Sequence, residues 1–102
     1  MVLELTEKNF SQEVLEHKGK MMVEFWASWC PPCKSMEEIM DDLAKETGVK
    51  IGKMNINRNR LTPRKYSVGG VPTFMIFKNG EEQERYVGAH SEDQLREILK
   101  KV

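Results

Sequence analysis

The sequence predicts an α/β fold in which helices cover both faces of a mixed central β-sheet. Strand patterns and helix patterns alternate along the 102 residues, in the order β-α-β-α-β-α-β-β-α. Strands separated by helices favour parallel pairing, whereas the one strand-turn-strand unit near the end must be antiparallel. A chain of this length can bury one hydrophobic core, so we expect residues 1–102 to form a single domain.

Three elements are predicted before the two cysteines. Residues 2–5 form a short apolar opening typical of a strand. Asn9 with Gln12 three residues later resembles a capping box, which predicts a helix from this point. Residues 21–27 are apolar on both faces except at Glu24, and this pattern is typical of a central buried strand.

The clearest predicted helix follows the cysteines. One apolar stripe recurs at helical spacing, formed by Met36, Ile39, Met40, Leu43 and Ala44. Gly48 follows as a C-cap residue would. Residues 49–56 then predict a strand, and residues 57–66 predict a weaker helix or a loop, because a proline interrupts them.

The last part of the chain predicts a hairpin and a helix. Residues 73–78 and 83–87 have strand character and flank the Asn-Gly pair at positions 79–80. Asn-Gly is preferred in type I′ turns because both positions need a positive φ. Ser91 and Gln94 have capping-box spacing, so we expect the final helix to begin there.

Composition and charge exclude several classes of function. Sixteen basic and sixteen acidic residues give a net charge of zero, which argues against a nucleic-acid or membrane-surface binder held by bulk charge. No apolar stretch approaches the roughly 18 residues of a membrane span, and no basic-then-apolar secretory signal opens the chain. We therefore expect a cytoplasmic protein.

The two cysteines, Cys30 and Cys33, are too few for the framework of a disulfide-rich secreted domain. They lie between a predicted buried strand and a predicted helix. Because proline disfavours helical backbone in the residue before it, Cys30 and Pro31 should be extended and Pro32 should be the first helical residue. Residues one helical turn apart lie roughly 5–6 Å apart, within reach of a disulfide.

This placement predicts different roles for the two sulfur atoms. The helix N-terminus and the amides of Cys33 and Lys34 favour a thiolate at Cys30. Cys33 should be the less exposed sulfur, because it lies in the first turn of the helix. We therefore expect Cys30 to attack an incoming disulfide and Cys33 to resolve the mixed disulfide.

Two other interpretations of the pair remain open at this point. Zinc needs four ligands, and the other soft candidates, His17 and His90, lack paired ligand spacing. A pair retained by chance or for packing is the second alternative. A c-type haem is excluded, because position 34 is Lys rather than His.

The cysteine pair is part of a longer motif, Phe25-Trp26-Ala27-Ser28-Trp29-Cys30-x-Pro32-Cys33-Lys34. Further motifs follow along the chain: Lys53-Met54-Asn55-Ile56-Asn57, Val71-Pro72-Thr73-Phe74, Phe77-Lys78-Asn79-Gly80 and Val87-Gly88-Ala89. In these motifs and in their order, the chain resembles the thioredoxin family from end to end. The resemblance implies the thioredoxin fold and the reduction of protein disulfides by dithiol-disulfide exchange.

The same resemblance implies partners and a contact surface. No bound cofactor is expected, because the Cys30–Cys33 disulfide is itself the redox centre. Partners would be oxidised client proteins and a thioredoxin reductase, either NADPH-dependent or ferredoxin-linked, and we expect a monomer. Pro72 matches the family's cis-proline, which presents the Val71 backbone to an extended substrate segment. The predicted contact surface comprises Trp29, Pro31, Pro32, Gly70, Val71, Pro72 and Gly88.

Glu24 occupies the position of the family's buried aspartate, which helps to deprotonate the resolving cysteine. Burial should raise the pKa of Glu24 and let it accept a proton near neutral pH. Lys53 matches the family lysine near this carboxylate. The alternative is a carboxylate at the strand edge with Lys53 in solvent.

The chain departs from the common family pattern at two positions. Pro31 replaces a glycine, so a specialised reductase or oxidant with a shifted potential is one alternative function, and a binding module without turnover is another. Glu38 stands where many members have a kinking proline, so we expect a straighter helix here. The basic clusters at 58–60 and 64–65 read as solvated surface, with the steering of an acidic partner as their alternative role.

Overall fold

A computed structural model describes residues 2–101, and Met1 and Val102 of the predicted domain lie outside the described part. The strands are β1 (Val2–Leu5), β2 (Lys20–Trp26), β3 (Lys50–Asn55), β4 (Thr73–Lys78) and β5 (Glu81–Val87). The helices are η1 (Ser11–Leu15, a π-helical turn), α1 (Pro31–Ser35), α2 (Glu37–Thr47), α3 (Leu61–Lys65) and α4 (Glu92–Lys101). The predicted order of strands and helices is confirmed.

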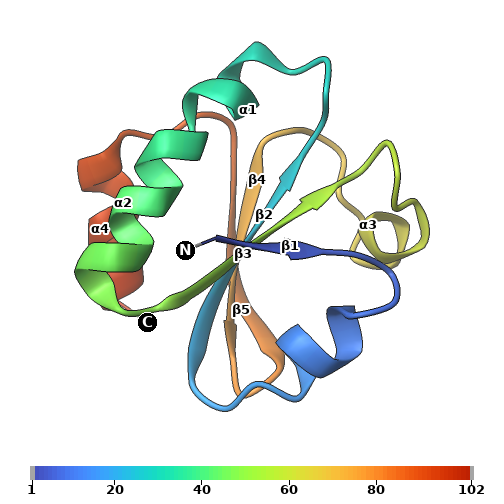
Figure 1. The fold of residues 1–102 in the computed structure, drawn as a ribbon, viewed down its shortest axis with the longest axis horizontal. Helices are drawn as coiled ribbons and strands as arrows, with labels where there is room; N and C mark the ends of the chain where they lie inside the picture. Colours follow the sequence, from blue (N-terminus) through green and yellow to red (C-terminus); the bar gives the residue numbers. More distant parts are fainter. Residues whose placement is uncertain (1, 102) are drawn as a thin grey trace.

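The five strands form one mixed sheet in the order β1-β3-β2-β4-β5. The β1-β3 and β3-β2 pairs are parallel, whereas β4 runs antiparallel to both of its neighbours. Figure 1 shows α2 and α4 together on one side of the sheet, with α3 and the blue η1 turn on the other side. Strand β2 is therefore central and covered on both faces, as its apolar pattern predicts.

Each face of the sheet has its own core. The α2/α4 side buries a cluster that includes Met22, Ile51 and Ile76. The η1/α3 side buries a second cluster that includes Met21, Val23 and Phe25. Alternate residues of β2 belong to the two clusters, because successive side chains of a strand point to opposite faces.

The turns follow the sequence signals closely. Asn79 and Gly80 both have positive φ, at 53° and 81°, so the hairpin between β4 and β5 has the predicted backbone. Ser91 and Gln94 form the predicted capping box with mutual bonds of 2.8 and 3.1 Å. Gly48 ends α2 in the left-handed region with φ 71°.

The predicted Asn9–Gln12 capping box is wrong. The Asn9 side chain accepts from the Thr6 amide at 2.7 Å, and Thr6 Oγ1 accepts from the Asn9 amide at 3.3 Å. Thr6 therefore caps the turn that leads into η1, and Asn9, three residues later, is its reciprocal partner. The cap lies three residues earlier than expected because either polar residue can fill that position.

The expectation of a straighter helix after the cysteines is also wrong. The segment divides at Met36 into α1 and α2, although no proline stands there. The Met36 amide donates to Cys33 O at 3.2 Å, an i to i−3 bond that tightens the end of α1, and α2 then continues from the Met40 amide to Met36 O. Local hydrogen bonding, rather than a proline, interrupts the helix.

Candidate active site

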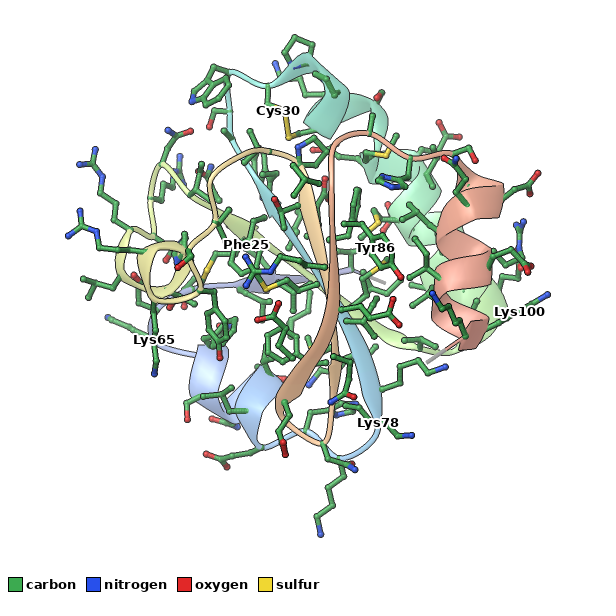
Figure 2. The ribbon with its side chains drawn as sticks, turned by 180° about the vertical axis from the view of Figure 1, so that it is seen from behind. Phe25, Cys30, Lys65, Lys78, Tyr86 and Lys100 are labelled. Carbon is green, nitrogen blue, oxygen red and sulfur yellow. A yellow bond between two sulfur atoms is a disulfide. The ribbon has the colours of Figure 1, made fainter. Side chains whose placement is uncertain are left out.

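The two cysteines form a disulfide at the start of α1, with Cα atoms 5.3 Å apart. Figure 2 shows this sulfur bridge next to Cys30 at one end of the molecule, opposite Lys78. Cys30 has extended backbone (φ −100°, ψ 102°) and is the N-cap of α1. Its Sγ accepts a hydrogen bond from the Cys33 amide at 3.2 Å. A helix-terminal amide therefore points at the sulfur predicted to attack.

Two details of this junction differ from expectation. The helix begins at Pro31 rather than at Pro32, because the φ of proline suits the first helical position and its missing N–H costs nothing there. Cys33 is not the less exposed residue, since Cys30 and Cys33 are each 2% exposed. In the disulfide state both sulfur-bearing residues are buried, so exposure does not distinguish their roles.

The disulfide lies on a small apolar cluster and beside an exposed aromatic ring. Cys30 and Cys33 pack with Ala27, and the half-buried Val71 packs against this cluster. Trp29 is 66% exposed, whereas most large apolar side chains of the chain are buried. Trp29 is therefore available for contact with another molecule.

The segment before β4 brings the rest of the predicted contact surface together. The Val71–Pro72 peptide bond is cis, as the family resemblance implies. The Gly88 amide donates to Pro72 O at 2.8 Å, which joins the end of β5 to this segment. A Cβ at Gly70 would lie 3.3 Å from Val87, so glycine fits this close approach. Pro31 and Pro32 are both exposed on α1.

Glu24 is the buried charged residue of the site, at 2% exposure. Burial raises the pKa of Glu24 to about 8, although the charge of Lys53 acts to lower it and that of Glu37 acts to raise it. Among residues 2–101, no side chain or backbone group donates a hydrogen bond to Glu24 Oε2. The Glu24 carboxyl group therefore titrates close to neutral pH, so its protonated and ionised forms coexist there.

Lys53 lies directly beside Glu24 across the β2-β3 pair, as expected. Its ammonium forms an ion pair with Glu37 of α2, at 3.7 Å from Oε1, and lies 5.4 Å from the centre of the Trp26 ring. The side chain is thus neither free in solvent nor paired with Glu24 alone. Lys53, Glu24, Trp26 and Glu37 are therefore neighbours on the α2 side of the sheet, and Glu37 is the ion-pair partner of Lys53.

Glu37 and Trp26 Nε1 were not among the predicted site groups. Glu37 reaches Lys53 only because α2 packs beside β3, and nothing in the spacing of these residues signals that contact. Trp26 belongs to the quoted motif, but its buried Nε1, which has no hydrogen-bond partner among residues 2–101, is a property of tertiary packing.

The zinc alternative has no support in the described part of the chain. Across residues 2–101, no three His, Cys, Asp or Glu side chains are grouped as a metal ion would require. His90 packs edge-on against Phe74 and Tyr86 and lies 2.7 Å from Gly88 O through Nδ1.

Over residues 2–101, every helix is too short or too polar to cross a membrane.

Comparison with known proteins gives one consistent result. The family model described as thioredoxin matches residues 1–101. The chain is similar to the thioredoxin of Buchnera aphidicola subsp. Schizaphis graminum, with 43% identity over 96% of this chain and 93% of that protein. It is also similar to the thioredoxins of Rickettsia prowazekii (42% identity, covering 99% and 98%) and Pseudomonas aeruginosa (40% identity, covering 96% and 93%).

Proposed function

Because this chain belongs to the thioredoxin family and is a thiol-disulfide oxidoreductase that reduces protein disulfides, we propose that Cys30 attacks and Cys33 resolves. The Cys30 thiolate attacks one sulfur of the client disulfide, forms a mixed disulfide and releases the first client thiolate. The Cys33 thiolate then attacks Cys30 Sγ, which forms the Cys30–Cys33 disulfide and releases the second client thiolate. The client gains two electrons, and the protein loses two.

The observation that carries this assignment is the hydrogen bond from the Cys33 amide to Cys30 Sγ at the N-cap of α1. A donor and a helix N-terminus stabilise negative charge on sulfur, and this lowers the free energy of the attacking thiolate. Cys33 lies inside the helix and has no equivalent donor among residues 2–101. The geometry therefore supports Cys30 as the nucleophile.

We also assign Glu24 as the group that accepts the proton of Cys33 during the second step. A base works best when its pKa lies near the working pH, and the pKa of Glu24 is raised to about 8 by burial. In this proposal Lys53 is a positioning residue, since its positive charge favours the ionised carboxylate. Glutamate is one methylene longer than aspartate, and the transfer proceeds directly or through one water.

The proposed client surface surrounds the disulfide. It consists of Trp29, Pro31, Pro32, Gly70, Val71, Pro72 and Gly88. We propose that the protein is a cytoplasmic monomer and that residues 1–102 form a single domain. After each cycle, a thioredoxin reductase, NADPH-dependent or ferredoxin-linked, returns two electrons to the Cys30–Cys33 disulfide.

Single cysteine variants test the assignment of the two sulfur atoms. Cys33→Ser is expected to hold client proteins in a mixed disulfide through Cys30, because the resolving thiol is missing. Cys30→Ser is the matched control and is expected to hold none. The measurement is non-reducing electrophoresis with insulin as the client, alongside insulin reduction by the wild type. Trapping by Cys30→Ser instead of Cys33→Ser would reverse the assignment.

A further inference from the structure

An open groove of about 600 Å³ lies beside the redox site, between the end of β3 and α3. Its lining includes two exposed arginines, Arg60 and Arg64, and two half-buried apolar residues, Ile56 and Val68. Figure 2 shows α3, next to Lys65, on the opposite side of the sheet from α4 and Lys100. The groove is thus separate from the charged group around Glu24, which lies on the α2 side.

The groove is continuous with the surface around the disulfide. Ile56, which lines the groove, also packs against the cluster of Ala27, Cys30 and Cys33. Asn57, at the rim, accepts a hydrogen bond from the Ser28 amide at 3.0 Å, and Ser28 is two residues before Cys30. The groove therefore adjoins the disulfide, and a client segment bound at Cys30 would lie next to it.

The arginines of the groove lack internal partners. Arg60 and Arg64 are exposed, and neither has a carboxylate within 4.0 Å among residues 2–101; the same holds for Arg58, which is near the groove but does not line it. Arg85 and Arg96, by contrast, are paired with Glu82 and Glu46. In a chain with zero net charge, this segment is a local concentration of unpaired positive charge.

The backbone that carries the arginines is held in place by Glu7. The Glu7 carboxylate accepts hydrogen bonds from the Leu61 amide at 2.6 Å and from the Thr62 amide at 3.2 Å. The Glu7 amide donates to Asn59 Oδ1 at 3.0 Å, and Asn59 is itself buried. These three hydrogen bonds therefore position the segment between the end of β3 and α3.

We propose that this groove binds an acidic segment of the client protein, next to the disulfide that is being reduced. Two exposed guanidinium groups beside half-buried apolar side chains suit acidic side chains. Guanidinium forms paired hydrogen bonds with carboxylate, and the apolar side chains can contact the methylene groups of Asp and Glu. The inference rests on the proposed function, since it concerns the same clients. It adds a preference that the backbone-rich surface around Pro72 does not supply.

The test uses two synthetic peptides with the same internal disulfide. One carries a flanking Asp-Glu-Asp segment and the other carries Asn-Gln-Asn. The wild type is expected to reduce the acidic peptide with a kcat/KM about 3–10-fold higher at low salt, mostly through KM, because exposed ion pairs contribute modestly and salt screens them. The preference should disappear in 0.5 M salt.

Two double variants separate the groove from net charge. Arg60→Gln with Arg64→Gln should abolish the preference and leave reduction of the neutral peptide unchanged. Lys18→Gln with Lys78→Gln is the matched control, because it removes the same charge from exposed residues and leaves the groove intact. Lys78 lies at the far end of the molecule from Cys30 (Figure 2). The control should keep the wild-type preference.

Three results would overturn the groove proposal: no preference in the wild type, a preference that survives in the arginine variant, or an equal loss in the lysine control. In each of these the neutral peptide is still reduced, so the proposed function stands. Failure of the wild type to reduce either peptide would instead count against the proposed function.

Discussion

The two faces of strand β2 differ in the polarity of their side chains. On the η1/α3 side, the odd-numbered residues 21–25 are apolar, fully buried and part of one continuous core. On the α2/α4 side, Met22 belongs to the other core, but Glu24 and Trp26 follow it towards the disulfide. One face of β2 is therefore apolar along these residues, whereas the other begins with a core residue and continues with the polar groups of the site.

The difference appears in hydrogen bonding as well as in residue type. Over residues 2–101, two buried side-chain atoms lack a hydrogen-bond partner, Glu24 Oε2 and Trp26 Nε1, and both lie on the α2 side of β2. A buried polar atom without a partner costs stability. The comparison indicates a division of roles: the apolar face supplies stability, and the opposite face carries the reactive groups at some cost in stability. The substitutions below test this division.

The largest expected effect is on the apolar face. Phe25→Ala should lower the free energy of unfolding of the oxidised protein by about 3–5 kcal/mol, because it removes a buried ring and leaves a cavity. Insulin reduction per folded molecule should remain within about twofold of wild type, since Phe25 does not point towards the Glu24 side. Denaturant unfolding and turnover at low temperature measure the two quantities.

Val23→Ala is the milder variant if Phe25→Ala does not fold. It removes two methyl groups from the same cluster. A large loss of turnover per folded molecule, with little loss of stability, would show that the two faces are not separate.

The next effect is on the reactive face and has the opposite sign. The pKa of Glu24 is about 8 in the folded protein and near 4.5 in the unfolded chain. Between these values the unfolded chain releases a proton that the folded protein keeps, so wild-type stability falls as pH rises. Glu24→Gln removes this titration. Between pH 5 and pH 8, the wild type should therefore lose about 3–4 kcal/mol of unfolding free energy through this group, and Glu24→Gln should not lose it.

Unfolding of both proteins at pH 5 and pH 8 measures this difference. Equal pH dependence of wild type and Glu24→Gln would mean that Glu24 is not the titrating group. The same variant should slow insulin reduction by about 10²-fold, the usual contribution of a general base, and Glu24→Asp should restore most of the rate. A merely structural role would not give rescue together with a changed pH profile.

The smallest expected effect concerns the residue that connects α2 to this face. Glu37 acts to raise the pKa of Glu24 and holds the ammonium of Lys53 at 3.7 Å. Glu37→Gln should lower the midpoint of the Glu24 titration by less than about one pH unit, because partly exposed charges interact weakly. Infrared titration of the buried carboxyl group measures this midpoint.

Glu38→Gln is the matched control for Glu37→Gln. Glu38 is the next residue of α2, is exposed, and has no ion pair among residues 2–101. It should leave the Glu24 midpoint unchanged. A shift of equal size in both variants would mean that net charge, and not the contact with Lys53, sets the effect.

Much of the fold could be predicted because its signals are local. The Asn-Gly turn, the Ser91–Gln94 cap and the apolar stripes of α2 and α4 each depend on residues a few positions apart. The cap at Thr6 and the break at Met36 could not be predicted. In each, two local arrangements compete with similar energies, and the packing of the finished fold selects one.

The site divides in the same way. The spacing of Cys30 and Cys33, and the polar interruption at Glu24, are visible in the sequence and correctly indicate the junction and the buried carboxyl group. The basic clusters that supply Arg60 and Arg64 are visible in the sequence, but the hollow between them is a product of the folded backbone. The contact between Lys53 and Glu37 joins two separate elements, β3 and α2. Such contacts exist only after the sheet order is fixed, so residue spacing contains no signal for them.

Glu7 affects how much conformational entropy the arginine-bearing segment loses when a partner binds. Burial acts to raise the pKa of Glu7, but hydrogen bonds from Thr62 and from the Leu61 amide hold it below its usual value. The Glu7 carboxylate therefore stays ionised at neutral pH and keeps its hydrogen bonds to Leu61 and Thr62. Because it orders the segment that bears the arginines during folding, that segment loses little conformational entropy on association. If clients bind this groove as proposed, they meet a segment that is already ordered.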